Sequence, residues 1–444
     1  MQLLLGLAAA PFAIWLVVVL VREPLRIALP VYAALIPFGG AVSLADSKFA
    51  SLSSLAGIVL GAGLALRVLR SRQAGVRLSA TVPIWLLFLA VAGATVIWSV
   101  EPDATVSSVY ILVSLIAIYV LVAVCPVDRS TLRRVENGLV IGGLACVGYG
   151  LFQLIVLGGF PSDPPVPGST DGRFGNGLLG PNNQAIALLL PLLISITRSV
   201  TLPARAKRLL HVVVSILLLG GILLTGSRGG LLATGVALVV LVAVAHRGRA
   251  VLAACGLVAA LVAAFVFFTN PYGVAEREVE TTSSSGRTDI WQVGLTACPE
   301  YCAFGSGWGT FPTVYADTQA SVPDARVLVG GGAYEPHNVW ILVGIELGVL
   351  GIVLLAAALL ASFAEAWRLP AGLRSPPLAG LAATVFAATF LSNLEFKFFW
   401  MALMLVILCR NLTDPDEAPV AAIDPATPVS TFPDGRIARS NGAG

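Results

Sequence analysis

Charged residues are scarce in this sequence of 444 residues. Only 11% of its residues are Asp, Glu, Lys or Arg, whereas 57% are hydrophobic. In soluble globular domains about a quarter of all residues are charged, because the surfaces of these domains face water. The shortage of charge therefore excludes an ordinary soluble protein and indicates a chain that is embedded in lipid.

Two further patterns are missing. The sequence has no series of ten-residue segments with alternating polarity, which excludes a transmembrane β-barrel. Its first residues, Met1–Leu5, contain no Lys or Arg, whereas a cleaved signal peptide begins with a basic region. We therefore interpret the first apolar run as a membrane span.

Apolar runs of membrane-spanning length recur along almost the whole chain. They cover roughly 2–20, 25–42, 51–67, 81–98, 106–125, 135–158, 181–197, 209–225, 229–245, 250–268, 338–363, 377–393 and 398–410. Because backbone polar groups must be paired inside lipid, these runs predict an all-α polytopic membrane protein of about 12–13 transmembrane helices.

The runs divide the chain into four parts. Residues 1–268 form an N-terminal transmembrane bundle, 269–337 a large polar loop and 338–410 the C-terminal transmembrane helices. The remainder, 411–444, is rich in Pro, Ala, Asp and Thr without apolar periodicity, which predicts a disordered cytoplasmic tail.

Basic residues gather in alternate connections, which places those connections on one side of the membrane. By the positive-inside rule this side is cytoplasmic, so the large loop lies on the outer side. The cytoplasmic clusters are Arg22/Arg26, Arg67/Arg70/Arg72/Arg77, Arg129/Arg133/Arg134, Arg198/Arg205/Lys207/Arg208, Arg247/Arg249 and Arg368/Arg374.

Histidine and cysteine are also few. Of three histidines, His337 alone is remote from the basic clusters; it lies where the large loop meets the helix predicted from Asn338. Four of the six cysteines fall in or beside apolar runs, whereas Cys298 and Cys302 share the loop at i, i+4 spacing. In an outer loop these two can form a disulfide, and they lack partners for a metal site.

Few cations lie on the outer side, so each invites a functional explanation. They are Lys48, Arg173, Arg228, Arg277, Arg287, Arg326 and Lys397. Three have suggestive contexts: Arg228 in a tight Thr-Gly-Ser-Arg-Gly-Gly turn, Arg173 shortly before Gly180-Pro181, and Arg287 where serines lead into a loop helix. Guanidinium groups bind phosphates bidentately and stay charged, so converging arginines suit an anionic, phosphate-bearing substrate.

Each candidate also has a simpler interpretation. Arg228 can extend to lipid phosphate, Arg173 and Arg287 can be solvated loop charges, and His337 can be a residue that only caps a helix. As a catalytic group, His337 would exchange a proton near neutral pH, with Ser227 and Asn338 in supporting positions. Glu346, deep in the following helix, is a functional candidate that would pair with an arginine.

A glycine-rich segment, Gly305-Ser306-Gly307-Trp308-Gly309, lies in the large loop. It resembles a phosphate-binding loop only weakly, because no strand–helix unit surrounds it. We expect a turn with an exposed tryptophan that contacts sugar or lipid.

Together these motifs resemble the O-antigen ligase and polymerase family of bacterial envelope glycosyltransferases. The resemblance rests on the turn at 225–230, Ser-Gly-Arg with Ile-Trp at 285–291, Gly-Ser-Gly-Trp-Gly-Thr-Phe at 305–311, and Pro-His-Asn followed by Glu-Leu-Gly-Val-Leu-Gly at 336–351. Their order and their common outer side carry it over roughly residues 165–360; the remainder is similar in topology.

The resemblance implies a GT-C-like, metal-independent transferase in the bacterial inner membrane, with its active site facing the periplasm or exterior. The donor would be a glycan on undecaprenyl diphosphate, and the acceptor a hydroxyl-bearing glycan, lipid or protein. Arg228 and Arg287 would bind the diphosphate with Arg173 nearby, and His337 would be the general base. No cofactor, metal or nucleic acid is implied.

Alternatives remain open at this point. A ligase and a polymerase share these motifs. A transporter or flippase of lipid-linked sugars is the main alternative from another class, although we find no inverted repeat. A structural scaffold would leave Arg228 and His337 replaceable.

Overall fold

The computed structural model of the chain describes residues 17–39, 51–70, 78–160, 173–175, 179–245, 247–250, 253, 256, 287–322 and 335–412. Several predictions lie outside these residues: most of the first span, nearly all of the 250–268 segment, Lys48, Arg277, Arg326 and the tail after Leu412. The four-part division of the chain stays a prediction.

The described residues form helices and no β-strand. The N-terminal ones are η1 (Pro24–Ala28), α2 (Leu29–Leu35), η2 (Ile36–Phe38), α3 (Leu52–Arg70), α4 (Thr81–Ala94), η4 (Thr95–Ile97), α5 (Pro102–Ala123) and α6 (Arg129–Val156). They are followed by α7 (Gly180–Ala187), α8 (Leu189–Thr201), α9 (Arg205–Leu224) and α10 (Arg228–Val244). The remaining ones are α12 (Arg287–Tyr301), α13 (Phe311–Thr318), η7 (Gln319–Ser321), α14 (Val339–Arg368), α15 (Ala371–Ala388) and α16 (Lys397–Arg410).

The predicted all-α membrane fold is confirmed. Six stretches of helix within the described residues are long and apolar enough to cross a membrane, and shorter apolar helices accompany them. Apart from 2–20 and 250–268, every apolar run predicted from the sequence coincides with one to three described helical elements. Helices far apart in sequence form the bundle: α10 packs against α15, and α4 against α14.

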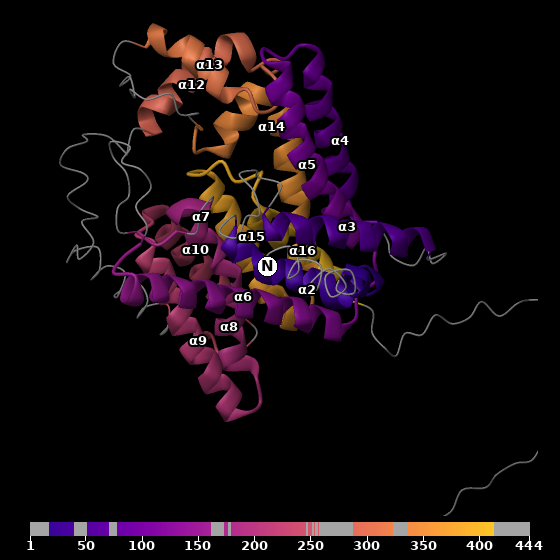
Figure 1. Cartoon of the computed structure of the whole chain (residues 1–444), viewed down its shortest axis with the longest axis vertical. Coiled ribbons are helices and arrows are strands. Elements are labelled where there is room, and N and C mark those ends of the chain that lie inside the picture. The colour runs from indigo at the N-terminus through magenta and orange to yellow at the C-terminus, as the bar shows by residue number, and fades with distance from the viewer. Residues whose placement is uncertain are drawn as a thin grey trace, which may run out of the picture.

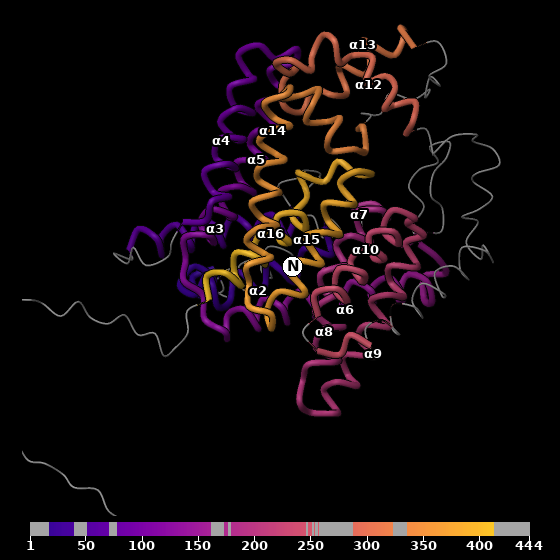
Figure 2. The backbone as a smooth tube through the Cα atoms, turned by 180° about the vertical axis from the view of Figure 1, so that it is seen from behind, coloured from indigo at the N-terminus to yellow at the C-terminus, as the bar shows by residue number. Residues whose placement is uncertain are grey.

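The two helices of the large loop lie at one end of the molecule. Figure 1 shows α12 and α13 beside the first part of α14 and the adjoining ends of α4 and α5, with α9 at the opposite end. The view from behind shows the same arrangement (Figure 2). Ile290, Val293, Phe311 and Val314 form a small core with Ile345 of α14, which fixes the loop helices onto that helix.

Helix α14 is interrupted at Gly348. This residue has φ 67°, and its backbone leaves the helical conformation there. The segment after α12 supplies the missing hydrogen bonds: Ser306 N donates to Ile345 O (2.9 Å), Gly307 N to Glu346 O (3.0 Å), and Val349 N to Cys302 O (2.8 Å). A break in an apolar helix is tolerated where another part of the protein satisfies its backbone groups, as here.

The glycine-rich segment is therefore a structural connection, and the prediction of an exposed tryptophan is wrong. Trp308 is 1% exposed, its ring packs edge-on against Phe88 (5.8 Å between centroids), and its backbone N–H donates to Thr95 Oγ1. A Cβ on Gly305 would lie 2.3 Å from Glu346 O, so only glycine allows this close approach. The glycines of this segment allow its backbone to approach the backbone of α14 closely enough for hydrogen bonds.

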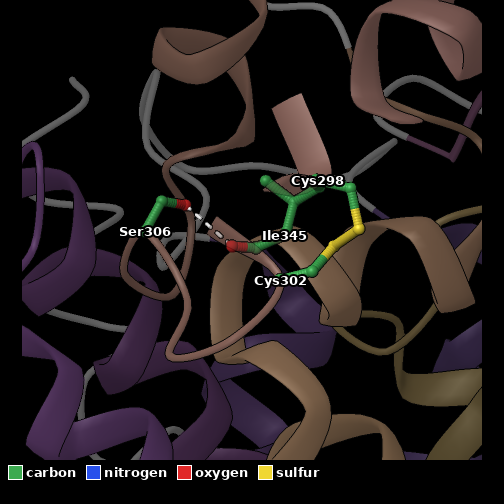
Figure 3. The surroundings of a disulfide bond; sticks show 4 residues. All are labelled: Cys298, Cys302, Ser306 and Ile345. Atoms are coloured by element: carbon green, nitrogen blue, oxygen red, sulfur yellow. Dashed lines mark hydrogen bonds between the residues drawn. A yellow bond between two sulfur atoms is a disulfide. The ribbon is translucent and has the colours of Figure 1, made fainter. Parts of the chain in front are cut away.

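The Cys298–Cys302 disulfide, one of the possibilities left open by the sequence, is present. It joins the last turns of α12 next to the docking segment, where Ser306 Oγ also donates to Ile345 O (3.1 Å; Figure 3). Cys125, Cys146 and Cys409 are buried thiols, as expected for small core residues.

Candidate functional site

The turn before α10 presents Arg228 at the first position of that helix. Gly226 adopts φ 57°, a left-handed conformation that glycine reaches without strain, and this reverses the chain after α9. Ser227 caps α10: its Oγ accepts from Gly230 N (3.1 Å). Ser227 thus has a local structural role beside the candidate arginine.

Arg173 lies against the same turn. Its Nε donates to Thr225 O (2.7 Å) and one terminal nitrogen to Asn182 Oδ1 (3.2 Å), while Phe174 N donates to Leu224 O (3.0 Å). The segment 173–175 is thereby joined to the turn that carries Arg228 and to the start of α7. The structure thus places Arg173 against the turn that ends at Arg228.

His337 immediately precedes α14 and has an unusual backbone. Its φ of 46° makes it the one non-glycine residue with positive φ among those that the structure describes. Such conformations cost free energy and concentrate at functional sites. Asn338 then caps α14, because its Oδ1 accepts from Trp340 N (2.9 Å) and Ile341 N (3.2 Å).

Helix α12 brings Arg287 to His337. Trp291 Nε1, one turn after Arg287, donates to Pro336 O (2.7 Å), which fixes the start of α12 against the residue before His337. Trp291 was not singled out from the sequence, although an Ile-Trp pair after Ser-Gly-Arg was part of the resemblance. Its indole explains why the helix and the His337 loop stay together.

The charges of three side chains influence one another. Burial, together with the charge of Arg228, lowers the pKa of the Arg287 guanidinium. Burial and the nearby charge of Arg287 lower the pKa of His337 to about 4. Arg287 thus links Arg228 to His337, and we refer to these three residues as one cluster. The low pKa of His337 keeps its imidazole neutral at neutral pH beside the Arg287 cation.

This cluster, with Arg173 next to it, can bind an anion and accept a proton. The N-termini of α10 and α14 add positive potential at Arg228 and His337. Guanidinium groups supply paired donors for phosphate oxygens, and an unprotonated imidazole nitrogen accepts a proton. The arrangement suits a reaction in which a phosphate-bearing group leaves as a hydroxyl attacks.

The sequence analysis expected Glu346 to pair with an arginine, but among the residues that the structure describes it forms no such ion pair. It is 1% exposed, and its Oε1 accepts from Phe311 N (3.0 Å) at the start of α13. The carboxylate therefore fixes the loop onto α14, two residues before the break at Gly348. The prediction missed this because the partner is a backbone group of a distant segment.

The comparison with known families points to the same region. Residues 213–356 match the family model described as O-antigen ligase. This central region is O-antigen ligase-like.

The matched region contains Arg228, Arg287, His337 and Glu346, whereas Arg173 precedes it. No curated protein sequence matches the chain significantly. The apolar helices indicate a multi-pass membrane protein, and its region 213–356 is similar to O-antigen ligases.

Proposed function

We propose that this O-antigen ligase-like chain is a glycosyltransferase that moves a glycan from undecaprenyl diphosphate to a hydroxyl acceptor. One observation carries the proposal: the hydrogen bond from Trp291 Nε1 to Pro336 O (2.7 Å) holds the start of α12, and with it Arg287, next to His337. The charge of Arg287 lowers the pKa of His337, and the charge of Arg228 lowers the pKa of Arg287. A pair of cations beside a neutral base fits a diphosphate leaving group and a hydroxyl nucleophile.

The arginines stabilise the leaving group. As the bond between the anomeric carbon and the diphosphate oxygen breaks, negative charge accumulates on the diphosphate. Arg228 and Arg287 neutralise it through bidentate hydrogen bonds, with Arg173 adjacent through the turn at Thr225. Fixed guanidinium groups supply this charge without a metal ion, which supports a metal-independent reaction of the GT-C-like kind.

His337 activates the acceptor. Its unprotonated ring nitrogen removes the proton from the acceptor hydroxyl while that oxygen attacks the anomeric carbon. The new glycosidic bond forms, undecaprenyl diphosphate leaves, and the proton stays on the imidazole until it is released to solvent. The low pKa of His337 in the absence of substrate keeps the base form available.

The site belongs on the outer face of the inner membrane in this proposal. Two features support that side: the scarcity of cations around the large loop, and the Cys298–Cys302 disulfide, a bond typical of oxidising compartments. Surface polysaccharide is then ligated or polymerised where the lipid-linked donor is exposed.

A transfer assay tests this function. Purified protein in lipid nanodiscs receives labelled undecaprenyl-diphosphate glycan and candidate acceptors, and the release of undecaprenyl diphosphate is measured with the glycan products, with and without EDTA. His337→Ala should lower the rate about 100- to 10,000-fold, which is the usual range for a general base. Arg228→Lys should weaken donor use, because an ammonium lacks the bidentate geometry.

Two matched variants serve as controls. His211→Ala and Arg208→Lys change the same residue types in α9 and should transfer glycan at the unsubstituted rate. Normal product from His337→Ala would remove the base assignment, and full inhibition by EDTA would contradict metal independence. Movement of intact donor across the bilayer without any glycosidic product would favour a flippase.

A further inference from the structure

A cavity of about 610 Å³ lies beside the catalytic cluster and is separate from it. Its walls come from α2, α3 and α5 together with the segment 395–398 that leads into α16. Neither the three arginines nor His337 line it, but Glu335, two residues before His337, does. The cavity therefore approaches the proposed base through Glu335.

The part of the cavity between α3 and α5 is lined mainly by apolar residues, several of them Gly or Ala. On α3, Gly57, Gly61 and Ala65 line it at helical spacing, and on α5 the facing residues include Ile118. From Ser54 to Ala65 the helix rises roughly 16 Å, enough to accompany an extended hydrocarbon chain. A Cβ on Gly61 would lie 3.9 Å from its nearest neighbour, Ile118, so the space beside Gly61 is open.

Its polar end has a different character. Glu335, Glu395 and Lys397 line it with Ser51 and Ser54. Lys397 Nζ donates to Ser53 Oγ (2.8 Å) and Ser54 Oγ (2.9 Å), so the lysine charge is directed toward α3. Two carboxylates disfavour a diphosphate here, whereas they accept hydrogen bonds from hydroxyl groups.

An aromatic pair completes this polar end. The rings of Phe396 and Phe398 stack with centroids 5.5 Å apart, and both line the cavity. Phe398 is buried, whereas Phe396 is partly exposed. The flat ring of Phe396 suits the apolar face of a sugar ring, while neighbouring carboxylates and hydroxyls suit the edge of the sugar. The combination favours a hydroxylated headgroup attached to an apolar chain.

The groove also lies almost wholly outside the region that matches the family. Only Glu335, among the residues that line it, falls within 213–356. The groove is thus formed almost wholly by residues outside the region that contains Arg228, Arg287 and His337.

We propose that this groove is the acceptor site, and that the acceptor is an amphiphile with a hydroxylated headgroup and a single long apolar chain. The chain lies between α3 and α5, and the headgroup at Glu335 and Glu395 presents a hydroxyl to His337. The inference rests on the proposed transferase function and makes the reaction a transfer to a lipid acceptor.

Photo-crosslinking tests the occupancy of the groove directly. The full-length protein in nanodiscs is irradiated with a long-chain alkyl glucoside that carries a diazirine near the end of its chain, and the labelled peptides are mapped. Label is expected on α3 and α5. Gly61→Leu places a large side chain in the groove and should reduce labelling about ten-fold, because the leucine occupies the space that the chain of the probe needs.

Two comparisons make the result specific. Gly235→Leu introduces the same side chain on α10, where no atom lies within 4 Å of the added Cβ, and should leave labelling unchanged. Glu395→Gln should weaken labelling about ten-fold through the loss of charge-assisted hydrogen bonds. In transfer assays the groove variants Gly61→Leu and Glu395→Gln should raise the KM for the alkyl glucoside acceptor and leave the KM for the donor unchanged.

Three results would overturn the inference. Undecaprenyl diphosphate that displaces the probe would assign the groove to the donor chain. A probe with the same chain and an unhydroxylated headgroup that labels equally well would remove the headgroup recognition. Labelling that persists in Gly61→Leu would place the probe elsewhere. Mapped binding without any glycan transfer would instead contradict the transferase function alone.

Discussion

At the scale of single residues, His337 combines two properties that oppose each other. Its surroundings keep the imidazole neutral, because burial and Arg287 lower its pKa to about 4. A base with so low a pKa accepts protons weakly. A bound diphosphate brings negative charge to the same place and raises the pKa of His337. We therefore expect donor binding to convert an available but weak base into an effective one.

The pH dependence of transfer tests this coupling. The ratio kcat/KM reports the pKa of the free enzyme, and kcat reports that of the donor complex. Because His337 must be unprotonated to act, kcat/KM should rise as the pH increases through about 4, the pKa of His337 in the free enzyme. Above about pH 6.5, the ordinary pKa of a histidine, kcat/KM should be constant. The acid limb of kcat should lie at higher pH. Two coincident limbs near pH 6.5 would contradict the coupling.

Arg287→Gln provides the matched comparison for that profile. It removes the cation whose charge lowers the pKa of His337, so the limb of kcat/KM should move to higher pH. The shift should be partial, since burial is the larger cause. Arg208→Gln, a change in α9 remote from the site, should leave the limb in place.

The residues of this cluster could be predicted from the sequence for one physical reason. Cations are rare on the outer side of a membrane protein, so Arg173, Arg228 and Arg287 stood out, as did a histidine beyond the basic clusters. The partner of Glu346 could not be predicted in that way. Its carboxylate accepts a hydrogen bond from the backbone N–H of Phe311. Every residue except proline has such an N–H, so the residue types of the loop do not show which one binds Glu346.

At the scale of elements, the break in α14 determines where the loop can dock. The interruption at Gly348 frees the carbonyl groups of Ile345 and Glu346, which then accept from Ser306 and Gly307. The first part of α14 carries His337 and Asn338 at its start, so docking at the break also sets the position of the proposed base. Within the described residues the helices coincide with the predicted apolar runs, but this break was not predicted, because the run continues through it without a proline.

Gly348→Ala tests the break. An alanine there would have to adopt φ 67°, and its Cβ would lie 2.6 Å from Ala303 O. Left-handed strain and this clash should cost about 1–3 kcal/mol of local stability. The expected result is faster proteolysis between α12 and α13 and a reduced rate of glycan transfer, measured on protein that still inserts in the membrane.

Gly148→Ala is the control for Gly348→Ala. This glycine lies within α6, and no atom is within 4 Å of an added Cβ. Its replacement should be neutral or slightly stabilising, because alanine favours helix. Equal proteolysis rates for the two variants would show that the loop does not depend on the break.

At the scale of the whole molecule, the two ends of the bundle have different chemistry. Helices α12 and α13, the disulfide and the start of α14 lie at one end, and the basic connection between α8 and α9 belongs to the opposite end (Figure 1). The sequence predicts these sides through its basic loops. It could not predict the groove between α3 and α5, because a cavity depends on how small residues of two distant helices face each other.

Cysteine labelling on intact cells tests the sidedness on which the proposed reaction depends. Ala316 on α13 and Ala204 before α9 are exposed small residues, so Ala316→Cys and Ala204→Cys should not disturb packing. Because the large loop should face outward, a membrane-impermeant maleimide is expected to label Ala316→Cys in intact cells and Ala204→Cys only after permeabilisation. The unsubstituted chain gives the background, which should be low for the buried Cys125, Cys146 and Cys409 and the disulfide-bonded pair. The opposite labelling pattern would place the arginine–histidine cluster on the cytoplasmic side, where a reaction at the outer face is impossible.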